Sequence, residues 1–165
     1  SETNTIQITA EKSESTVTYY MSHPLHDFSG VNKNVQAVAT FDKNSKEIIS
    51  TVVVLAVADF NSGNDSRDAH AKEDLNAQKY PFVTFTSASI KQKNNALNVE
   101  GILDFHGVKR KILFTASEVQ KGGKMIFDGD FNVDMTNFKV KRPSLMGIKT
   151  DKLIKLVFHL EFNLS

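Results

Sequence analysis

Hydrophobic residues at every second position are the feature that most constrains how this chain folds. The clearest case is the segment 125–135, whose apolar positions are Met125, Phe127, Phe131, Val133 and Met135. Most residues between them are polar, among them three aspartates. The same alternation is found in the segments 15–22, 35–41, 97–105 and 154–162. Because successive side chains of a strand point to opposite faces, each segment predicts a strand with one dry face and one wet face.

Further elements complete the predicted sheet. The segments 82–90 and 108–117 are rich in β-branched and aromatic residues, and 5–12 is a weaker strand. The segment 48–60 is apolar on both faces, so we expect a helix or the N-terminal segment to cover its outer side. One helix is predicted over Arg67–Gln78, after the possible N-cap residues Asn64, Asp65 and Ser66. The segment 136–151 breaks the alternation and is predicted to be a long loop.

The short connections between the predicted strands determine the expected architecture. Turns at 42–46, 91–95, 106–107 and 121–123 leave room only for antiparallel neighbours. About eight such strands can close into a barrel, which removes exposed sheet edges. The predicted fold is therefore all-β, an eight-stranded antiparallel barrel with one short α-helix over an opening. We treat residues 1–165 as one domain, because no long polar or proline-rich linker interrupts them.

Composition excludes several classes of site. The chain has no cysteine, which rules out disulfides and thiolate metal sites. Its net charge is +1, so there is no electrostatic basis for nucleic-acid binding. No apolar run reaches the length of a transmembrane helix, and we find no signal peptide within these residues.

The apolar residues also predict what the barrel holds. The chain has 12 Phe but only 3 Tyr and no Trp, and Phe belongs in dry surroundings. Small inward residues such as Ala37, Ala39 and Gly101 are expected to leave space in the lumen. The residues predicted to line it are Met21, Phe41, Val54, Phe85, Phe105, Phe114, Phe127, Phe131 and Phe158. For each of them the alternative is that the side chain simply packs the barrel core.

Four motifs and one loop give the chain a family resemblance. The motifs are HPLHDFSG at 23–30, SRDAH at 66–70, KYPFVTFTS at 79–87 and GILDFHGV at 101–108. Together with the segment 131–145 they resemble the YceI-like family, in family order, over nearly the whole chain. The resemblance implies a lipocalin-like barrel that binds long polyisoprenoids or isoprenoid quinones, with no catalytic activity and no cofactor. It also implies export, so we expect a periplasmic or secreted protein, and members often pair, so a homodimer is an option.

Polar residues near the predicted helix are candidates for the barrel mouth. Arg67, Asp68 and His70 either bind the polar head of a ligand or, in the case of Arg67 and Asp68, form a structural pair that anchors the helix. A basic stretch follows later in the chain, with Lys139, Lys141, Arg142, Lys149 and Lys152. It is either simply solvated or makes transient contact with an anionic membrane surface, from which the barrel collects its ligand.

Two functions follow from these patterns, beside a third, structural reading in which a barrel with a filled core binds a protein partner through its loops. The first is non-catalytic binding, sequestration or transport of a long apolar lipid, a polyisoprenoid or isoprenoid quinone, in the lumen. The alternative is a metal-assisted or acid–base enzyme on the same scaffold that uses His23, His70 and Asp68. No His-Glu-x-x-His helix and no Gly-x-Ser-x-Gly motif supports an enzyme, so we expect no catalytic residues and no metal.

Overall fold

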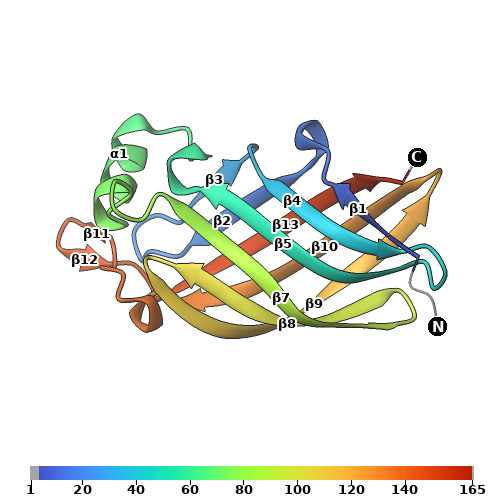
Figure 1. Ribbon diagram of the computed structural model, residues 1–165. Coiled ribbons are helices and arrows are strands. Elements are labelled where there is room, and N and C mark those ends of the chain that lie inside the picture. Colours follow the sequence, from blue (N-terminus) through green and yellow to red (C-terminus); the bar gives the residue numbers. More distant parts are fainter. Residues whose placement is uncertain (1–3, 165) are drawn as a thin grey trace.

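The computed structural model describes residues 4–164, most of which belong to one strongly curled antiparallel sheet (Figure 1). Its order is β1-β4-β5-β7-β8-β9-β10-β13-β2-β3-β6. The bounds are β1 (Thr5–Thr9), β2 (Thr16–Met21), β3 (Phe28–Asn32), β4 (Gln36–Asp42), β5 (Glu47–Ala56), β6 (Phe60–Asn61), β7 (Phe82–Lys93), β8 (Ala96–Phe105), β9 (Val108–Lys121), β10 (Lys124–Asp134) and β13 (Leu153–Asn163). A separate hairpin pairs β11 (Ser144–Leu145) with β12 (Ile148–Lys149).

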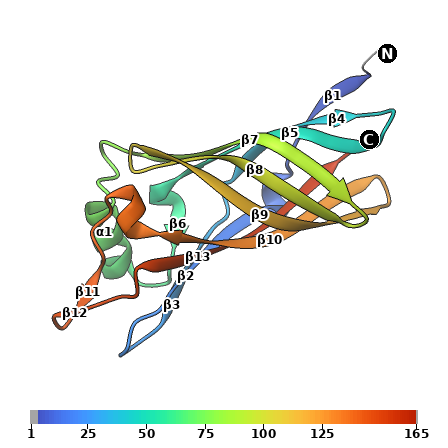
Figure 2. The ribbon, with the colours of Figure 1, turned by 90° about the horizontal axis from the view of Figure 1, so that it is seen from below.

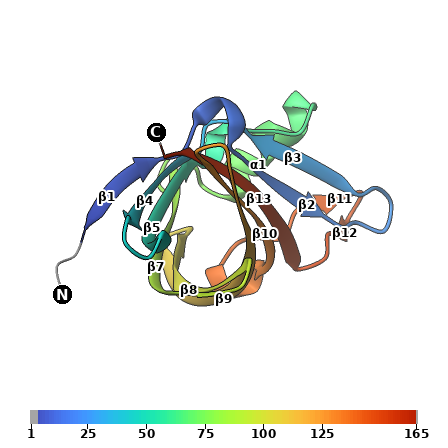
Figure 3. The same cartoon turned by 90° about the vertical axis from the view of Figure 1, so that its right-hand side faces the viewer.

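The sheet curls around an interior, as the end-on view in Figure 3 shows, but among residues 4–164 no continuous ladder closes it. Residues 10 and 11 bridge the gap on one side: Ala10 forms a single antiparallel bridge with Phe162, and Glu11 N–H donates to the Glu161 carbonyl at 2.8 Å. At the opposite edge of the sheet from β1, β6 pairs with β3. The predicted antiparallel barrel with one helix is confirmed, although the main sheet has 11 strands rather than eight. The sequence FSGVN of β3 shows no clear alternation of apolar and polar residues, and β6 has only two residues, so neither strand was predicted.

The apolar segment 48–60 differs from the prediction in two ways. Its strand, β5, ends at Ala56 and is followed by the 3₁₀ helix η2 (Val57–Asp59). The expected cover over its outer face is wrong, because Ile49 and Val52 remain 47% and 42% exposed. Apolar residues on both faces therefore do not show that both faces are buried.

The single α-helix of the described residues, α1 (Asp65–Asp74), lies over one end of the barrel (Figures 1 and 2). It begins at the predicted N-cap: the Asn64 side chain accepts a hydrogen bond from Arg67 N–H at 3.0 Å. The helix ends at Asp74, four residues before the predicted end at Gln78, and Asn76 beyond it adopts a φ of 48°. None of its residues is buried, so it rests on the rim rather than in the core. No helix among residues 4–164 has the length and hydrophobicity needed to cross a bilayer.

The segment 136–151 is more ordered than the predicted loop. It starts with the 3₁₀ helix η3 (Met135–Phe138), which the Asp134 side chain caps by accepting from Thr136 N–H at 2.9 Å. The β11–β12 hairpin follows and projects from the same end of the barrel as α1 (Figure 2). The first 3₁₀ helix, η1 (Lys12–Glu14), connects β1 to β2.

Candidate functional site

The main cavity, of about 560 Å³, lies at the α1 end of the barrel. Its apolar walls include Val17, Met21, Leu55, Val83, Leu103, Phe105, Val133, Met135, Ile154 and Leu156. Polar residues from α1 and from the segment before β11 also line it, among them Arg67, His70, Lys72, Lys141 and Arg142. The cavity is thus apolar inside and polar where α1 meets the β11 segment, and its volume falls in the usual range for small-molecule sites.

A second, smaller space of about 120 Å³ continues toward the other end of the barrel. It shares five lining residues with the main cavity: Val17, Leu55, Val83, Leu103 and Leu156. Phenylalanine rings narrow it. Phe114 stacks on Phe131 with centroids 5.1 Å apart, and Phe85 and Phe158 meet the ring of Phe114 edge-on at 5.3 and 5.5 Å. This Phe cluster (Phe85, Phe114, Phe131, Phe158) lines the smaller space and not the main cavity.

Ten of the twelve predicted site residues lie on these two cavities. The residues on the main cavity are Met21, Arg67, Asp68, His70 and Phe105. Those on the smaller space are Phe85, Phe114, Phe127, Phe131 and Phe158. Most of the predicted phenylalanines therefore line the smaller space rather than the main cavity.

Phe41 and Val54 line neither cavity. Phe41 is buried in the core, where its register partners are Ile6 on β1 and Ile48 on β5. Val54 is on the opposite face of β5 from the inward residues Val53 and Leu55. The sequence 52–55 is apolar at every position, so alternation could not identify the inward face there.

The expected space beside Gly101 is filled. A Cβ atom on this residue would lie 2.4 Å from the ring of Phe85 and 2.5 Å from the Thr86 carbonyl oxygen. Glycine at this position makes room for an aromatic ring from the neighbouring strand instead of leaving the lumen open. Ala39, by contrast, does line the smaller space.

Several wall residues were not singled out from the sequence, chiefly aliphatic ones such as Leu55, Leu103 and Val133, and the aromatic Tyr19 and Phe28. A signal was present for two of them, because Leu103 and Val133 alternate in phase with the predicted Phe105 and Phe131. Tyr19 also lies on the inward face of its strand. Choosing residues by aromatic character missed the aliphatic ones, which also border the cavity.

A polar cluster fixes the start of α1. The Asp68 carboxylate accepts hydrogen bonds from Ser62 N–H at 3.2 Å and from the Ser62 hydroxyl at 2.7 Å. The predicted pair between Arg67 and Asp68 is not among the ion pairs of residues 4–164, and Arg67 instead stacks over the Phe28 ring at 4.8 Å. Asp68 anchors the helix, but its partner is the preceding loop.

Tyr19 lies beside this cluster, edge-on to Phe60 with centroids 5.4 Å apart. Burial raises the pKa of its hydroxyl, and the nearby Asp68 carboxylate raises it further. Arg67 and a hydrogen bond with Ser62 act in the opposite direction. Tyr19 therefore stays a neutral hydrogen-bonding group at the cavity wall.

Of the three residues in the alternative enzyme hypothesis, His23 and Asp68 make structural contacts and His70 is exposed on the helix. His23 is buried, its Nδ1 accepts from Leu25 N–H at 3.0 Å, and its Nε2 lies 2.7 Å from the Ile148 carbonyl. This pattern places the ring proton on Nε2. His70 is exposed on α1, and Asp68 is engaged with Ser62. Within residues 4–164, no group of three His, Asp or Glu residues is arranged to hold a metal ion.

Fold and cavity together define a lipocalin-like antiparallel β-barrel with an apolar interior space. The family model of the YceI-like domain matches residues 8–162, and the chain belongs to this family. The protein YceI of Escherichia coli O6:H1 is 27% identical over 120 residues, which is 68% of this chain. That match covers 63% of the relative, less than two thirds of its length.

Two solved structures show the same fold. The Burkholderia cenocepacia protein BcnA superposes with a TM-score of 0.82 at 23% identity, covering 92% of this chain and 98% of BcnA. A polyisoprenoid-binding domain from Saccharophagus degradans, implicated in plant cell wall breakdown, gives a TM-score of 0.76 at 11% identity, covering 96% and 98%. At these identities the likeness concerns the fold.

Proposed function

We propose that this protein binds a long apolar lipid, a polyisoprenoid or an isoprenoid quinone, in the main cavity and performs no chemistry on it. The observation that carries the proposal is the cavity of about 560 Å³, with apolar walls and a polar rim at α1. Membership of the YceI-like family and the polyisoprenoid-binding neighbour support the same ligand class.

Burial of an isoprenoid chain is sufficient to drive such binding. Each CH₂-sized group removed from water contributes about 0.8 kcal/mol, so one five-carbon unit contributes roughly 3–4 kcal/mol before ordering costs. A cavity with these walls need supply only shape and dryness. The ligand's specificity then depends on cavity length and on the few polar groups at the rim.

The arrangement of the two spaces gives the ligand a direction. Its tail would lie between the walls above the Phe cluster, and its polar head would stay near Arg67 and His70 at the rim. A longer tail would need the rings of the Phe cluster to rotate, which would join the main cavity to the smaller space. A carrier of this kind protects the lipid while it crosses an aqueous compartment, for which we propose the periplasm.

Native mass spectrometry of gently purified protein tests the proposal. We expect a population heavier than the bare chain by the mass of one lipid, which organic extraction then releases for identification. As a second measurement, purified protein is incubated with geranylgeraniol and separated from free lipid. Protein that carries no lipid and takes up no geranylgeraniol would overturn the proposal.

A further inference from the structure

Apolar side chains are exposed at the cavity end of the barrel, on two neighbouring loops. Met146 at the tip of the β11–β12 hairpin is 85% exposed, and Leu145 and Ile148 beside it are 48% and 42% exposed. Leu25, in the connection between β2 and β3, is 54% exposed. The Nε2 atom of His23 joins the two loops through the Ile148 carbonyl. Figure 2 shows both loops projecting from the same end of the molecule.

The turn at the hairpin tip does not itself call for an apolar residue. Met146 and Gly147 have φ values of 53° and 77°, the pattern of a two-residue type I′ turn. Asn or Gly is favoured at the first of these positions, because other side chains are disfavoured at positive φ. Methionine here gains no core packing in return, and its apolar side chain is left exposed.

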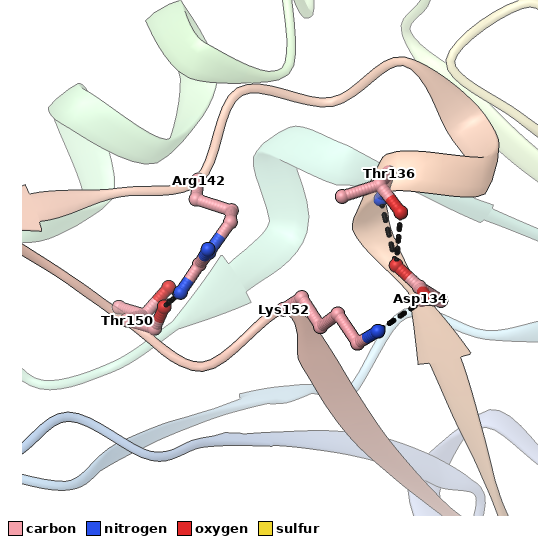
Figure 4. A network of polar contacts seen from close by, with 5 residues as sticks. All are labelled: Asp134, Thr136, Arg142, Thr150 and Lys152. Atoms are coloured by element: carbon pink, nitrogen blue, oxygen red, sulfur yellow. Dashed lines mark hydrogen bonds and ion pairs between the residues drawn. The ribbon is translucent and has the colours of Figure 1, made fainter.

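Contacts at its base hold the hairpin in place. The Arg142 guanidinium donates to the Thr150 carbonyl, with Nε at 2.9 Å, and Thr150 N–H donates to the Pro143 carbonyl at 2.9 Å. Nearby, Lys152 pairs with Asp134 at 3.7 Å, and Asp134 also accepts from the Thr136 hydroxyl at 2.6 Å (Figure 4). The hairpin is therefore presented outward on a fixed base.

The segment that carries this apolar tip is basic, whereas the helix beside it is acidic. The segment 139–152 contains five Lys or Arg residues and a single acidic residue, Asp151. The helix α1 (Asp65–Asp74) carries four acidic residues and two basic ones. An apolar tip on this basic segment matches the lipid tails and anionic head groups of a bilayer.

We infer that the β11–β12 hairpin seats the barrel on an anionic lipid bilayer, with Leu25, Met146 and Ile148 at the level of the head groups. This inference rests on the proposed function for its purpose, since Leu145 and Lys141 of the same segment line the main cavity. Docking would turn the side of the rim formed by the hairpin toward the membrane and leave the acidic helix facing water. Lipid could then pass between bilayer and cavity with little exposure to water.

Tryptophan reporters test the orientation, because the chain has no Trp of its own. Ile148→Trp places a reporter on the hairpin, and Leu113→Trp places one on β9 at a side chain that is 70% exposed. With vesicles of phosphatidylglycerol and phosphatidylcholine, we expect a blue shift in emission for Ile148→Trp and none for Leu113→Trp. Equal shifts for both, or no shift for Ile148→Trp, would overturn the inference.

Vesicle flotation measures the contributions of charge and apolar surface. Each positive charge removed near an anionic surface weakens binding roughly fivefold, so Lys149→Glu should weaken it well over fivefold. Lys91→Glu, near the end of β7 that lies away from the hairpin, should have no effect. Met146→Asn with Ile148→Thr should reduce binding while keeping the turn, because Asn suits the positive φ. Undiminished flotation of these hairpin variants, or of wild-type protein on pure phosphatidylcholine, would contradict the inference.

The two proposals fail separately. If the protein carries lipid but does not float with anionic vesicles, membrane docking is wrong and lipid binding stands. If it floats but neither carries lipid nor takes up geranylgeraniol, the proposed function is wrong. Leu145 and Lys141 are left unchanged in every variant, so the cavity lining stays intact.

Discussion

At the scale of single residues, small side chains decide where the interior is open. Gly101 gives its space to the Phe85 ring, whereas Ala39 borders the smaller cavity. The two look alike in the sequence, because each is a small residue on an inward face. Their roles differ because only at Gly101 does a large ring reach across from the next strand.

Gly101→Ala should destabilise the protein by about 1–3 kcal/mol, the usual cost of overpacking. The added methyl group would meet both a ring and the Thr86 carbonyl oxygen, and the backbone atom has little freedom to move. Urea unfolding measures the effect. Ile102→Val, on the exposed side of the same strand, should change stability by no more than about 0.5 kcal/mol. Equal stability of Gly101→Ala and wild type would show that the Phe85 ring yields freely.

Glu118 makes stability depend on pH. Burial raises the pKa of its carboxyl, the nearby Glu47 adds to the rise, and a hydrogen bond from Gln120 opposes it. Because the folded state then binds its proton more tightly than the unfolded state, stability falls as pH rises between the ordinary and the raised pKa. At neutral pH the ionised carboxylate therefore costs stability.

Glu118→Gln should consequently raise the thermal midpoint at pH 7. Below the ordinary glutamate pKa, where the wild-type carboxyl is protonated in both states, the two midpoints should converge. Differential scanning fluorimetry across this pH range measures the difference. A difference that is the same at both pH values would mean that the charge of Glu118 has no part in it.

At the scale of elements, α1 behaves as a cover with weak attachment. Its residues are not buried, and its start depends on two contacts: the Asn64 cap on Arg67 N–H and the hold of Asp68 on Ser62. Most helices in proteins are stable because one face packs on a core, and this one lacks such a face. Its opening should be local and independent of the sheet.

Asn64→Ala should therefore destabilise α1 by about 1 kcal/mol, as loss of an N-cap usually does. Hydrogen exchange should become roughly fivefold faster in residues 65–75 and stay unchanged in the strands. Ser66→Ala, at an exposed position of the same helix, is the matched control. A parallel loss of protection in the sheet would show that the helix and barrel open together.

The elements also differ in how well the sequence predicts them. Long strands such as β10 and β13 are predicted correctly because one face is buried and the other faces water. Apolar and polar residues therefore alternate along their sequences. The β11–β12 hairpin was predicted to be loop. Its strands have two residues each, and backbone and Arg142 contacts hold it rather than a buried face. Contacts of that kind leave no periodic pattern.

At the scale of the whole molecule, the interior is wider at the α1 end, with a cavity of about 560 Å³, than toward the other end, with a space of about 120 Å³. Val35, with 0% exposure, lies in the core away from the cavities, while Val133, with 2% exposure, faces the main cavity. Both are buried valines, and only the tertiary structure distinguishes them. The difference can be tested by replacing each valine with a larger residue.

Val133→Phe should keep stability within about 1.5 kcal/mol of wild type, because the ring enters existing space, and should sharply reduce uptake of geranylgeraniol. Val35→Phe should destabilise by about 1–3 kcal/mol or more, because no space receives the ring. Urea unfolding and the lipid-uptake assay measure the two effects. Strong destabilisation by Val133→Phe with uptake retained would argue against an open cavity at that wall.

The sequence by itself determined the fold class and the dry face of most strands through alternation, the antiparallel neighbours through short turns, and the start of the helix through its N-cap residues. These are local properties, set by which side of each strand must avoid water. Only the tertiary structure decided which dry residues fill space and which border it, and that Phe41 and Val54 lie off the cavity. The reason is that a cavity is the space left over when side chains from different strands pack together. The pattern along one strand does not contain that information.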